Sequence, residues 1–233
     1  MSSANAYTSE RVVFSFSLYG DKPKYTHGTL ANAKIIGDRF PDALMFVYTA
    51  ASVPADIQDQ LRALPHVRVI PVPSREGSMG MFDRFCAIDS SDCDVMFERD
   101  ADSRIHERDI ACIEDFLANP DKQIQIIRDH FYHRNYIMGC SFALRKSALK
   151  KPMAALIAES KFYQSAYGCD QKFLESEFYK QPYLSKALIY DRYGRFEPAS
   201  KLSPFRVPIT NNLFIGQVHL FREDGTEYTE FEA

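Results

Sequence analysis

The chain has 233 residues, of which 45% are hydrophobic and 25% charged, and its formal net charge is −3. This balance is typical of a soluble globular protein, and it excludes a global positive field that would attract nucleic acid or anionic membranes. No apolar run approaches the roughly 20 residues of a bilayer span, and the first residues lack the pattern of a signal peptide. The five cysteines include no CxxC pair, so neither a zinc knuckle nor a disulfide framework is indicated. We therefore expect a cytoplasmic protein with reduced thiols, no transmembrane segment and no nucleic-acid partner.

The first part of the chain alternates between strand and helix patterns. Residues 11–18 and 44–50 are rich in β-branched and aromatic residues and predict strands, as do residues 66–72. Apolar residues at helical spacing predict an amphipathic helix over 26–40, and a second helix begins at Pro54. This order predicts an α/β fold with a mostly parallel sheet and helices on both faces.

A polar, glycine-bearing loop is expected at 74–80, followed by a short helix from Met81 to Ile88. Residues 94–97 then predict a very short apolar strand, and apolar spacing from Ile110 to Leu117 predicts a helix that Asn119-Pro120 stops. Further on we expect a strand at 124–130, an aromatic and histidine-rich loop, and helices at 147–160 and 169–179. From Pro182 onward the chain shows little periodicity and is expected to be irregular.

Two carboxylates, Asp100 and Asp102, follow the short strand directly. In open α/β sheets, ligands bind beyond the carboxyl ends of the strands. Two carboxylates about 4 Å apart repel by roughly 4 kcal/mol at an effective dielectric constant of 20, whereas a divalent cation between them reverses that sign. The alternative is a solvated turn or a helix cap. However, Arg99 and Arg104 bracket the pair, which a cap does not require, and their donors suit phosphate or the carboxylates themselves.

The string RDADSR at 99–104 resembles the corresponding segment of a family of small GT-A glycosyltransferases that includes the chlorella-virus enzymes. The resemblance continues in the family's order through SFSLYG at 15–20, KYTHG at 24–28, MFDRF at 81–85, IIRDH at 126–130, CDQKFL at 169–174 and FIGQV at 214–218. It implies a GT-A (Rossmann-like) fold, a nucleoside-diphosphate sugar donor and Mn²⁺ or Mg²⁺ as cofactor. A viral origin would place the protein in the host cytosol.

Under this resemblance, residues 1–233 form a single GT-A domain, with a nucleotide-binding half to about residue 105 and an acceptor-side half from about 106. At the end of the first strand, Tyr19 could stack on uracil and Gly20 permits close backbone approach, although a plain strand-ending turn fits equally. Arg84 lies in an apolar segment and needs a phosphate or a carboxylate as partner. The candidate donor-binding residues of this half are Leu18, Tyr19, Gly20, Tyr25, Arg84, Arg99, Asp100, Ala101 and Asp102.

The acceptor-side half supplies the other candidates. Asp129 and His130 end a strand, where Asp129 could hold a sugar hydroxyl or act as a base toward the acceptor. Asp129 and Asp170 are the candidate catalytic residues, and His130 and Gln171 are further candidates for donor binding. Asp170 and Gln171 resemble an Asp-Gln pair that contacts the donor sugar near the reacting carbon, although Asp is also a common helix N-cap. His219, on an expected strand, is the candidate third metal ligand beside Asp100 and Asp102, and a core histidine is the competing interpretation.

The leading hypothesis is metal-dependent transfer of a sugar from a UDP-linked donor to a hydroxyl of a glycan or another acceptor. A haloacid-dehalogenase-like phosphohydrolase is an alternative, but that family places Thr or Val where Arg104 stands and carries its motif near the N-terminus. A catalytically silent module that binds sugar nucleotides stays open as well. Walker-type and GxGxxG loops are absent, which argues against kinases and dinucleotide dehydrogenases.

Overall fold

The computed structural model of the protein describes residues 9–222 and 224–229. Its β-strands are β1 (Val12–Leu18), β2 (Leu44–Ala50), β3 (Val67–Val72), β4 (Val95–Arg99), β5 (Ile124–Arg128), β6 (Ser141–Arg145), β7 (Ala187–Asp191), β8 (His219–Phe221) and β9 (Glu227–Thr229). Its α-helices are α1 (Pro23–Arg39), α2 (Ala55–Arg62), α3 (Glu107–Leu117), α4 (Met153–Glu159) and α5 (Cys169–Phe178). Its 3₁₀ segments are η1 (Gly77–Asp89), η2 (Lys146–Ala148), η3 (Tyr183–Lys186) and η4 (Ala199–Lys201).

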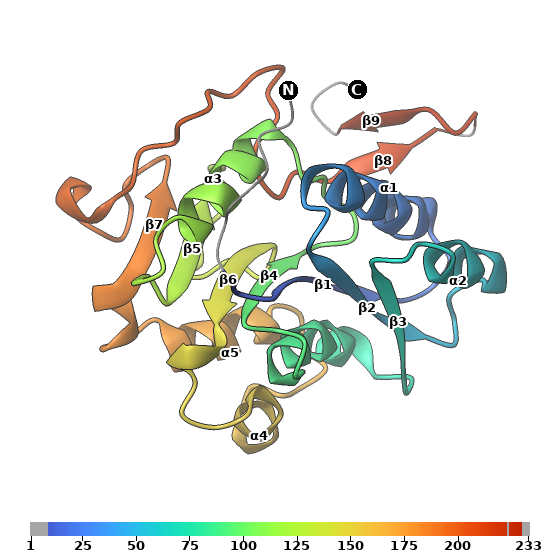
Figure 1. The fold of residues 1–233 in the computed structure, drawn as a ribbon, viewed down its shortest axis with the longest axis horizontal. Helices are drawn as coiled ribbons and strands as arrows, with labels where there is room; N and C mark the ends of the chain where they lie inside the picture. Colours follow the sequence, from blue (N-terminus) through green and yellow to red (C-terminus); the bar gives the residue numbers. More distant parts are fainter. Residues whose placement is uncertain (1–8, 223, 230–233) are drawn as a thin grey trace.

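Seven strands form one sheet in the order β3-β2-β1-β4-β6-β5-β7, and β8 pairs with β9 in a separate hairpin (Figure 1). Strand β6 runs antiparallel to its neighbours β4 and β5, while the other pairs are parallel. Because β4 and β5 both oppose β6, they point the same way. The carboxyl ends of β1, β4, β5 and β7 therefore meet at one edge of the sheet.

Helices cover both faces of the sheet (Figure 1). Side chains alternate between the faces along each strand, so that Phe14 and Phe16 of β1 pack with α1, α2 and α3, and Val13 packs on the opposite side. The opposite core holds η1, α4 and α5, with Phe82 and Phe173 in ring contact at 5.5 Å. The hairpin β8–β9 lies against α1, where His27 meets Phe221 edge to face at 5.4 Å.

The α/β class with a mostly parallel sheet is confirmed. The strands expected at 11–18, 44–50, 66–72, 94–97 and 124–130 are present, with bounds shifted by at most two residues. Two expectations were wrong: the helix at 147–160 is confined to α4, because η2 and an extended Leu149 precede it, and the stretch after 182 contains β7. Strand β6 was not predicted. None of the helices in the described ranges has the length and apolar character that crossing a membrane requires.

Strand β4 is joined to helix α3 by a buried ion pair. The Arg99 guanidinium donates to both oxygens of Asp109, with Nε–Oδ2 at 2.8 Å and Nη2–Oδ1 at 2.7 Å. Both residues are about 1% exposed. Such a pair fixes orientation, and removing one partner leaves an uncompensated charge in the core.

We therefore expect Asp109→Ala to lower the free energy of unfolding by roughly 3–5 kcal/mol. The control is Asp59→Ala, which breaks the exposed pair with Arg62 at 2.9 Å and should change stability by less than about 1 kcal/mol. Urea denaturation followed by circular dichroism measures both. Equal, small losses would show that the buried pair contributes no more than a surface pair.

Candidate active site

The Asp-x-Asp segment begins where β4 ends, at the center of the sheet. Strand alternation sends Arg99 to the face covered by α3, where it meets Asp109, and sends its neighbours Glu98 and Asp100 to the other face. That other face meets η1, which carries Arg84. One short strand thus delivers a structural ion pair to one face and two acidic groups to the other.

Arg84 lies at the center of a cluster of three carboxylates. Its Nε lies 2.5 Å from Oε1 of Glu98, its Nη1 donates to Asp100, and its Nη2 lies 3.3 Å from Oδ2 of Asp170. Arg84 is 1% exposed. Burial alone would lower the pKa of this guanidinium, but the three carboxylates outweigh burial and raise it. The cation stays charged and ties η1, β4 and the start of α5 together.

Asp170 is the second residue of α5, directly after the turn at Gly168, whose φ is +75°. Burial raises the pKa of its carboxyl group, and Arg84 opposes that effect. The close approach depends on Gly139, because a Cβ there would lie 3.0 Å from Oδ2 of Asp170. The neighbouring Gln171 accepts a hydrogen bond from the amide of Asn135. The structure therefore brings the Asp-Gln pair to the Asp-x-Asp segment.

Asp102 is held from two directions. Nζ of Lys24 in α1 lies 3.1 Å from its Oδ2, and its backbone oxygen accepts a 2.8 Å hydrogen bond from the N–H of His219. Burial and then the charge of Asp100 raise the pKa of Asp102. The two carboxylates are thus close enough to repel each other, and a positive charge between them would relieve that repulsion.

His219 is arranged to offer a lone pair. Its Nδ1 lies 3.0 Å from Oε1 of Glu227 in β9, and burial lowers the pKa of the imidazole, which favours the neutral ring. If Nδ1 carries the proton toward Glu227, Nε2 is an acceptor, and it has no hydrogen-bond partner among the described residues. A carboxylate behind a histidine is the usual support of a metal-binding imidazole.

These donors suit a divalent cation, since two carboxylates and a neutral imidazole are typical ligands of Mn²⁺. As the side chains stand, no group of three or more His, Cys, Asp or Glu residues in the described part of the chain is close enough to hold an ion. Asp100 and Asp102 are therefore the core of the candidate metal site. His219 adjoins it through the backbone hydrogen bond to Asp102.

Tyr19 and Gly20 follow the carboxyl end of β1, the strand next to β4 in the sheet. The Tyr19 hydroxyl donates to Asp83, which also pairs with Arg75 at 2.8 Å. The ring lies against η1, since a Cβ at Gly80 would lie 2.4 Å from Cζ of Tyr19. Gly20 has φ of +73° and donates its N–H to the Ser52 hydroxyl at 3.0 Å.

The remaining donor-side candidates are placed differently. Leu18 is fully buried and belongs to the core between the sheet and α1. The Tyr25 ring lies under the Lys24 ammonium at 4.5 Å. Ala101 is 5% exposed, and its carbonyl oxygen lies against Gly28 of α1.

Asp129 and Arg99 share one arrangement, a buried bidentate ion pair. Arg108 donates to both oxygens of Asp129 at 2.8 and 2.7 Å, and the N–H of Ile215 donates to Oδ2 at 3.0 Å. Asp129 is fully buried. These contacts occupy the carboxylate with structural partners and leave no exposed oxygen for a substrate.

His130 lies beside a cavity at the carboxyl ends of β5 and β7. Its ring stacks on Phe214 at 3.9 Å with an interplanar angle of 13°. Burial and then the charge of Arg192 lower the pKa of the imidazole. The cavity has a volume of about 300 Å³ and is lined by His130, Arg192, Tyr193, Ile209, Asn212 and Phe214.

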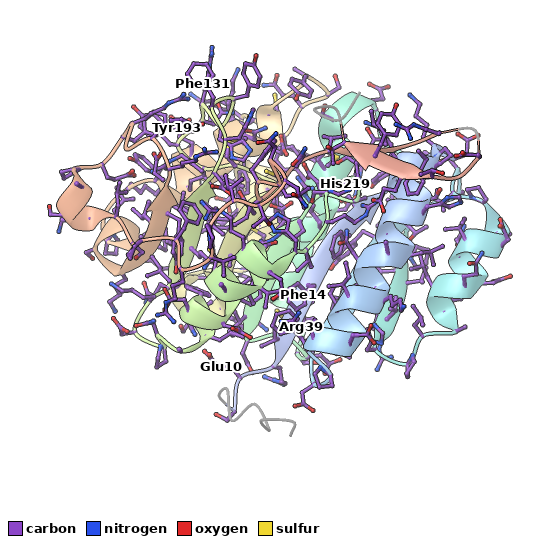
Figure 2. All side chains as sticks on the ribbon, turned by 90° about the horizontal axis from the view of Figure 1, so that it is seen from above. Glu10, Phe14, Arg39, Phe131, Tyr193 and His219 are labelled. Atoms are coloured by element: carbon purple, nitrogen blue, oxygen red, sulfur yellow. The ribbon has the colours of Figure 1, made fainter. Side chains whose placement is uncertain are left out.

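Figure 2 shows His219, Phe131 and Tyr193 toward one end of the molecule and Glu10, Phe14 and Arg39 toward the other. The first group belongs to the end where the parallel strands finish. Sequence reasoning missed several residues there, among them Lys24, Asp83, Glu98 and Glu227. Glu98 had a usable signal, because it precedes Asp100 by two residues in the same strand. Lys24 and Glu227 had none, since their partners are distant in sequence.

No family model matches the chain, and no curated protein matches it in sequence. Among solved structures, the chain is similar to the galactosyltransferase LgtC in complex with donor and acceptor sugar analogs, with a TM-score of 0.53 and 14% identity over 77% of this chain and 73% of the other. It is also similar to glucosyl-3-phosphoglycerate synthase from Mycobacterium tuberculosis in complex with Mn²⁺ and UDP-glucose, with a TM-score of 0.53 and 14% identity over 95% and 86%. These similarities show that the fold is a GT-A fold.

The contact between α1 and the Asp-x-Asp segment generates a prediction. Alanine normally stabilises a helix by roughly 1 kcal/mol relative to glycine, but a Cβ at Gly28 would lie 2.1 Å from the Ala101 carbonyl oxygen. We expect Gly28→Ala to lower the unfolding free energy, measured by urea denaturation. Lys34→Ala, at an exposed position of the same helix, should leave it unchanged. A stabilised Gly28→Ala variant would contradict the close packing.

His133 generates a second prediction, because burial lowers its pKa from 6.5 to about 4 and the ring accepts the N–H of Asp129 at 3.0 Å. The unfolded chain then binds one more proton than the folded chain between these values. Stability from this group is complete above pH 6.5 and is lost as the pH falls toward 4. Between pH 7 and pH 5 the loss should reach roughly 2 kcal/mol.

His133→Asn keeps an acceptor without the titration, so its unfolding free energy should fall less over the same pH interval. Urea titrations at pH 5, 6 and 7 measure the difference. Parallel pH dependences of the two proteins would show that His133 is not buried in its neutral form.

Proposed function

We propose that this protein transfers a sugar from a nucleoside-diphosphate donor, UDP-linked, to a hydroxyl acceptor, and that a divalent cation assists the reaction. The observation that carries the proposal is the position of Asp100 and Asp102. They stand at the carboxyl end of the central strand β4, repel each other, and lie beside Lys24 and His219. The GT-A fold supports the same interpretation.

Asp100 and Asp102 would hold Mn²⁺ or Mg²⁺, with His219 as third ligand once its Nε2 turns toward them. The bound cation would supply charge neutralisation of the diphosphate leaving group. The Lys24 ammonium, which forms an ion pair with Asp102, would be a second cation near the same phosphates. Arg84 of η1 donates a hydrogen bond to Asp100 and so restricts the orientation of its carboxylate.

The donor-binding residues we propose are Tyr19 and Gly20 for the nucleoside, Asp100 and Asp102 for the diphosphate, and Gln171 for the sugar. Tyr19 follows the end of β1, and the backbone at Gly20 is open, since no atom lies within 4 Å of a Cβ built there. Uridine as the base is supported by the glucosyl-3-phosphoglycerate synthase structure, which contains UDP-glucose and Mn²⁺.

Of the two candidate catalytic carboxylates, the geometry favours Asp170. Its Oδ2 lies 3.3 Å from Arg84 and within the cluster that includes Asp100. Asp129 is fully buried and accepts three short hydrogen bonds from Arg108 and Ile215, and we assign it a structural role in this proposal. Asp170 would contact the donor sugar near the reacting carbon.

We further propose, from the RDADSR resemblance, that the protein is related to the small chlorella-virus glycosyltransferases. In that arrangement, residues 1–105 supply β1 to β4 and most of the donor site, and residues 106–233 supply the acceptor side together with Asp170, Gln171 and His219. The position of the cavity next to His130 is consistent with this division.

The proposal predicts that Asp100→Asn and Asp102→Asn each lower the rate of nucleotide release by about 100-fold or more, while the circular dichroism spectrum is unchanged. The assay is a screen of UDP- and GDP-sugars with and without Mn²⁺. Asp121→Asn, at an exposed position, is the control and should keep the wild-type rate.

Equal rates of metal-dependent nucleotide release in the wild type and both variants would refute the assignment of the metal site. Binding of UDP and Mn²⁺ without release from any donor would identify a silent binding module. Release of inorganic phosphate from a phosphomonoester would favour the phosphohydrolase alternative.

A further inference from the structure

The loops after β5 and β7 carry an exposed group of aromatic and arginine side chains. Phe131, Tyr132 and Tyr193 are 49%, 68% and 43% exposed, although large hydrophobic side chains are usually buried. Figure 2 shows Phe131 and Tyr193 close to each other at the end of the molecule that also holds His219. We refer to the following residues as the aromatic–arginine platform: Phe131, Tyr132, Arg134, Arg192, Tyr193 and Arg195.

The arginines of the platform lack acidic partners. Arg134, Arg192 and Arg195 form no ion pair with any carboxylate of the described residues, whereas the buried arginines of this protein are paired. Their guanidinium groups lie over aromatic rings instead, with Arg195 at 4.6 Å and Arg134 at 4.9 Å from the Phe131 centroid. The platform therefore presents uncompensated positive charge beside apolar ring faces.

The platform is also held in place. The Asp191 carboxylate accepts the backbone N–H groups of Tyr193 and Gly194 at 2.9 and 3.0 Å, which fixes the loop after β7. Nη1 of Arg195 then donates to the Phe131 carbonyl oxygen at 2.7 Å and joins this loop to the loop after β5. A surface fixed in this way loses little conformational entropy when it binds a ligand.

The cavity of about 300 Å³ opens between the same loops, with Arg192 and Tyr193 in its wall. That volume is at the lower end of the range for small-molecule sites. Strand β5 is two strand spacings from β4, or about 10 Å, and the cavity and Asp100 both lie at the edge where the parallel strands end.

We propose that the platform and its cavity bind the acceptor, and that the acceptor is a sugar bearing a carboxylate or phosphate group. This inference rests on the proposed function. Aromatic faces offer apolar contact to a sugar ring, and arginine pairs with carboxylates and phosphates through two parallel hydrogen bonds. A long nucleic acid fits the observations less well, because the net charge is −3 and the platform is local.

The test uses the full chain saturated with UDP and Mn²⁺ and compares three probes by nuclear magnetic resonance titration. The probes are methyl β-glucuronide, glucose 6-phosphate and the neutral methyl β-glucoside. At least one acidic sugar should bind about tenfold more tightly than the glucoside. The two acidic probes distinguish a carboxylate from a phosphate as the recognised group.

The double variant Arg134→Gln/Arg192→Gln should lose that preference by about tenfold and keep its affinity for UDP. The matched control is Arg68→Gln in β3, at the opposite edge of the sheet. Arg68 is also exposed and has no carboxylate partner among the described residues, and its replacement should have no effect.

Normal UDP binding with equal affinity for acidic and neutral sugars would overturn the acceptor proposal and leave the proposed function intact. Binding of the acidic sugar to the protein without UDP, but not to the protein saturated with UDP, would also overturn it, since the platform would then belong to the donor site. Binding of a 20-nucleotide DNA that requires Arg134 and Arg192 would overturn it in favour of nucleic acid. Absence of UDP binding would instead contradict the proposed function.

Discussion

The buried guanidinium of Arg84 is the constraint on which the candidate site depends. Arginine does not lose its proton in proteins, so a fully buried Arg84 must be surrounded by negative charge. The chain supplies Glu98 and Asp100 from β4 and Asp170 from α5, and each approaches a different nitrogen of the same group. Because leaving a buried charge unpaired costs several kcal/mol, the three segments cannot separate independently. The ion pairs of Arg84 therefore stabilise the core and also fix the geometry of the candidate site.

Other buried arginines around the sheet are also paired with carboxylates. Arg99, Arg108, Arg128 and Arg145 are buried, and each has a carboxylate within 2.8 Å. These pairs join strands, helices and loops to one another, and hydrophobic contact alone would orient these segments less uniquely. Against this background, arginines without acidic partners are informative. The arginines of the aromatic–arginine platform keep their positive charge available at the end of the molecule where the parallel strands finish.

The parallel half of the sheet could be predicted because β1, β2 and β3 are apolar or β-branched runs separated by helical patterns. Strand β6 was missed for a physical reason. Ser141–Arg145 is short, carries Ser and Arg, and gains its stability from pairing with β4 and β5 on both sides. The position of Asp100 and Asp102 at the end of a strand was predictable from local sequence. The cluster around Arg84 was not, since Arg84 and Asp170 are 86 residues apart and only the folded chain joins them.

Asp129 and Asp170 show why residue type and position do not by themselves assign a role. Both are buried aspartates at the end of the sheet where ligands bind, and sequence reasoning treated them as equal candidates. A carboxylate has about four sites that accept hydrogen bonds. Asp129 gives three of them to Arg108 and Ile215 in short, well-formed contacts. The one ion pair of Asp170 is a long contact of 3.3 Å with an arginine that it shares with two other acids, and its other contacts are to backbone N–H groups of its own helix turn. Under the proposed function, the weaker engagement of Asp170, rather than its pattern in the sequence, favours it over Asp129 as the carboxylate that meets the donor sugar.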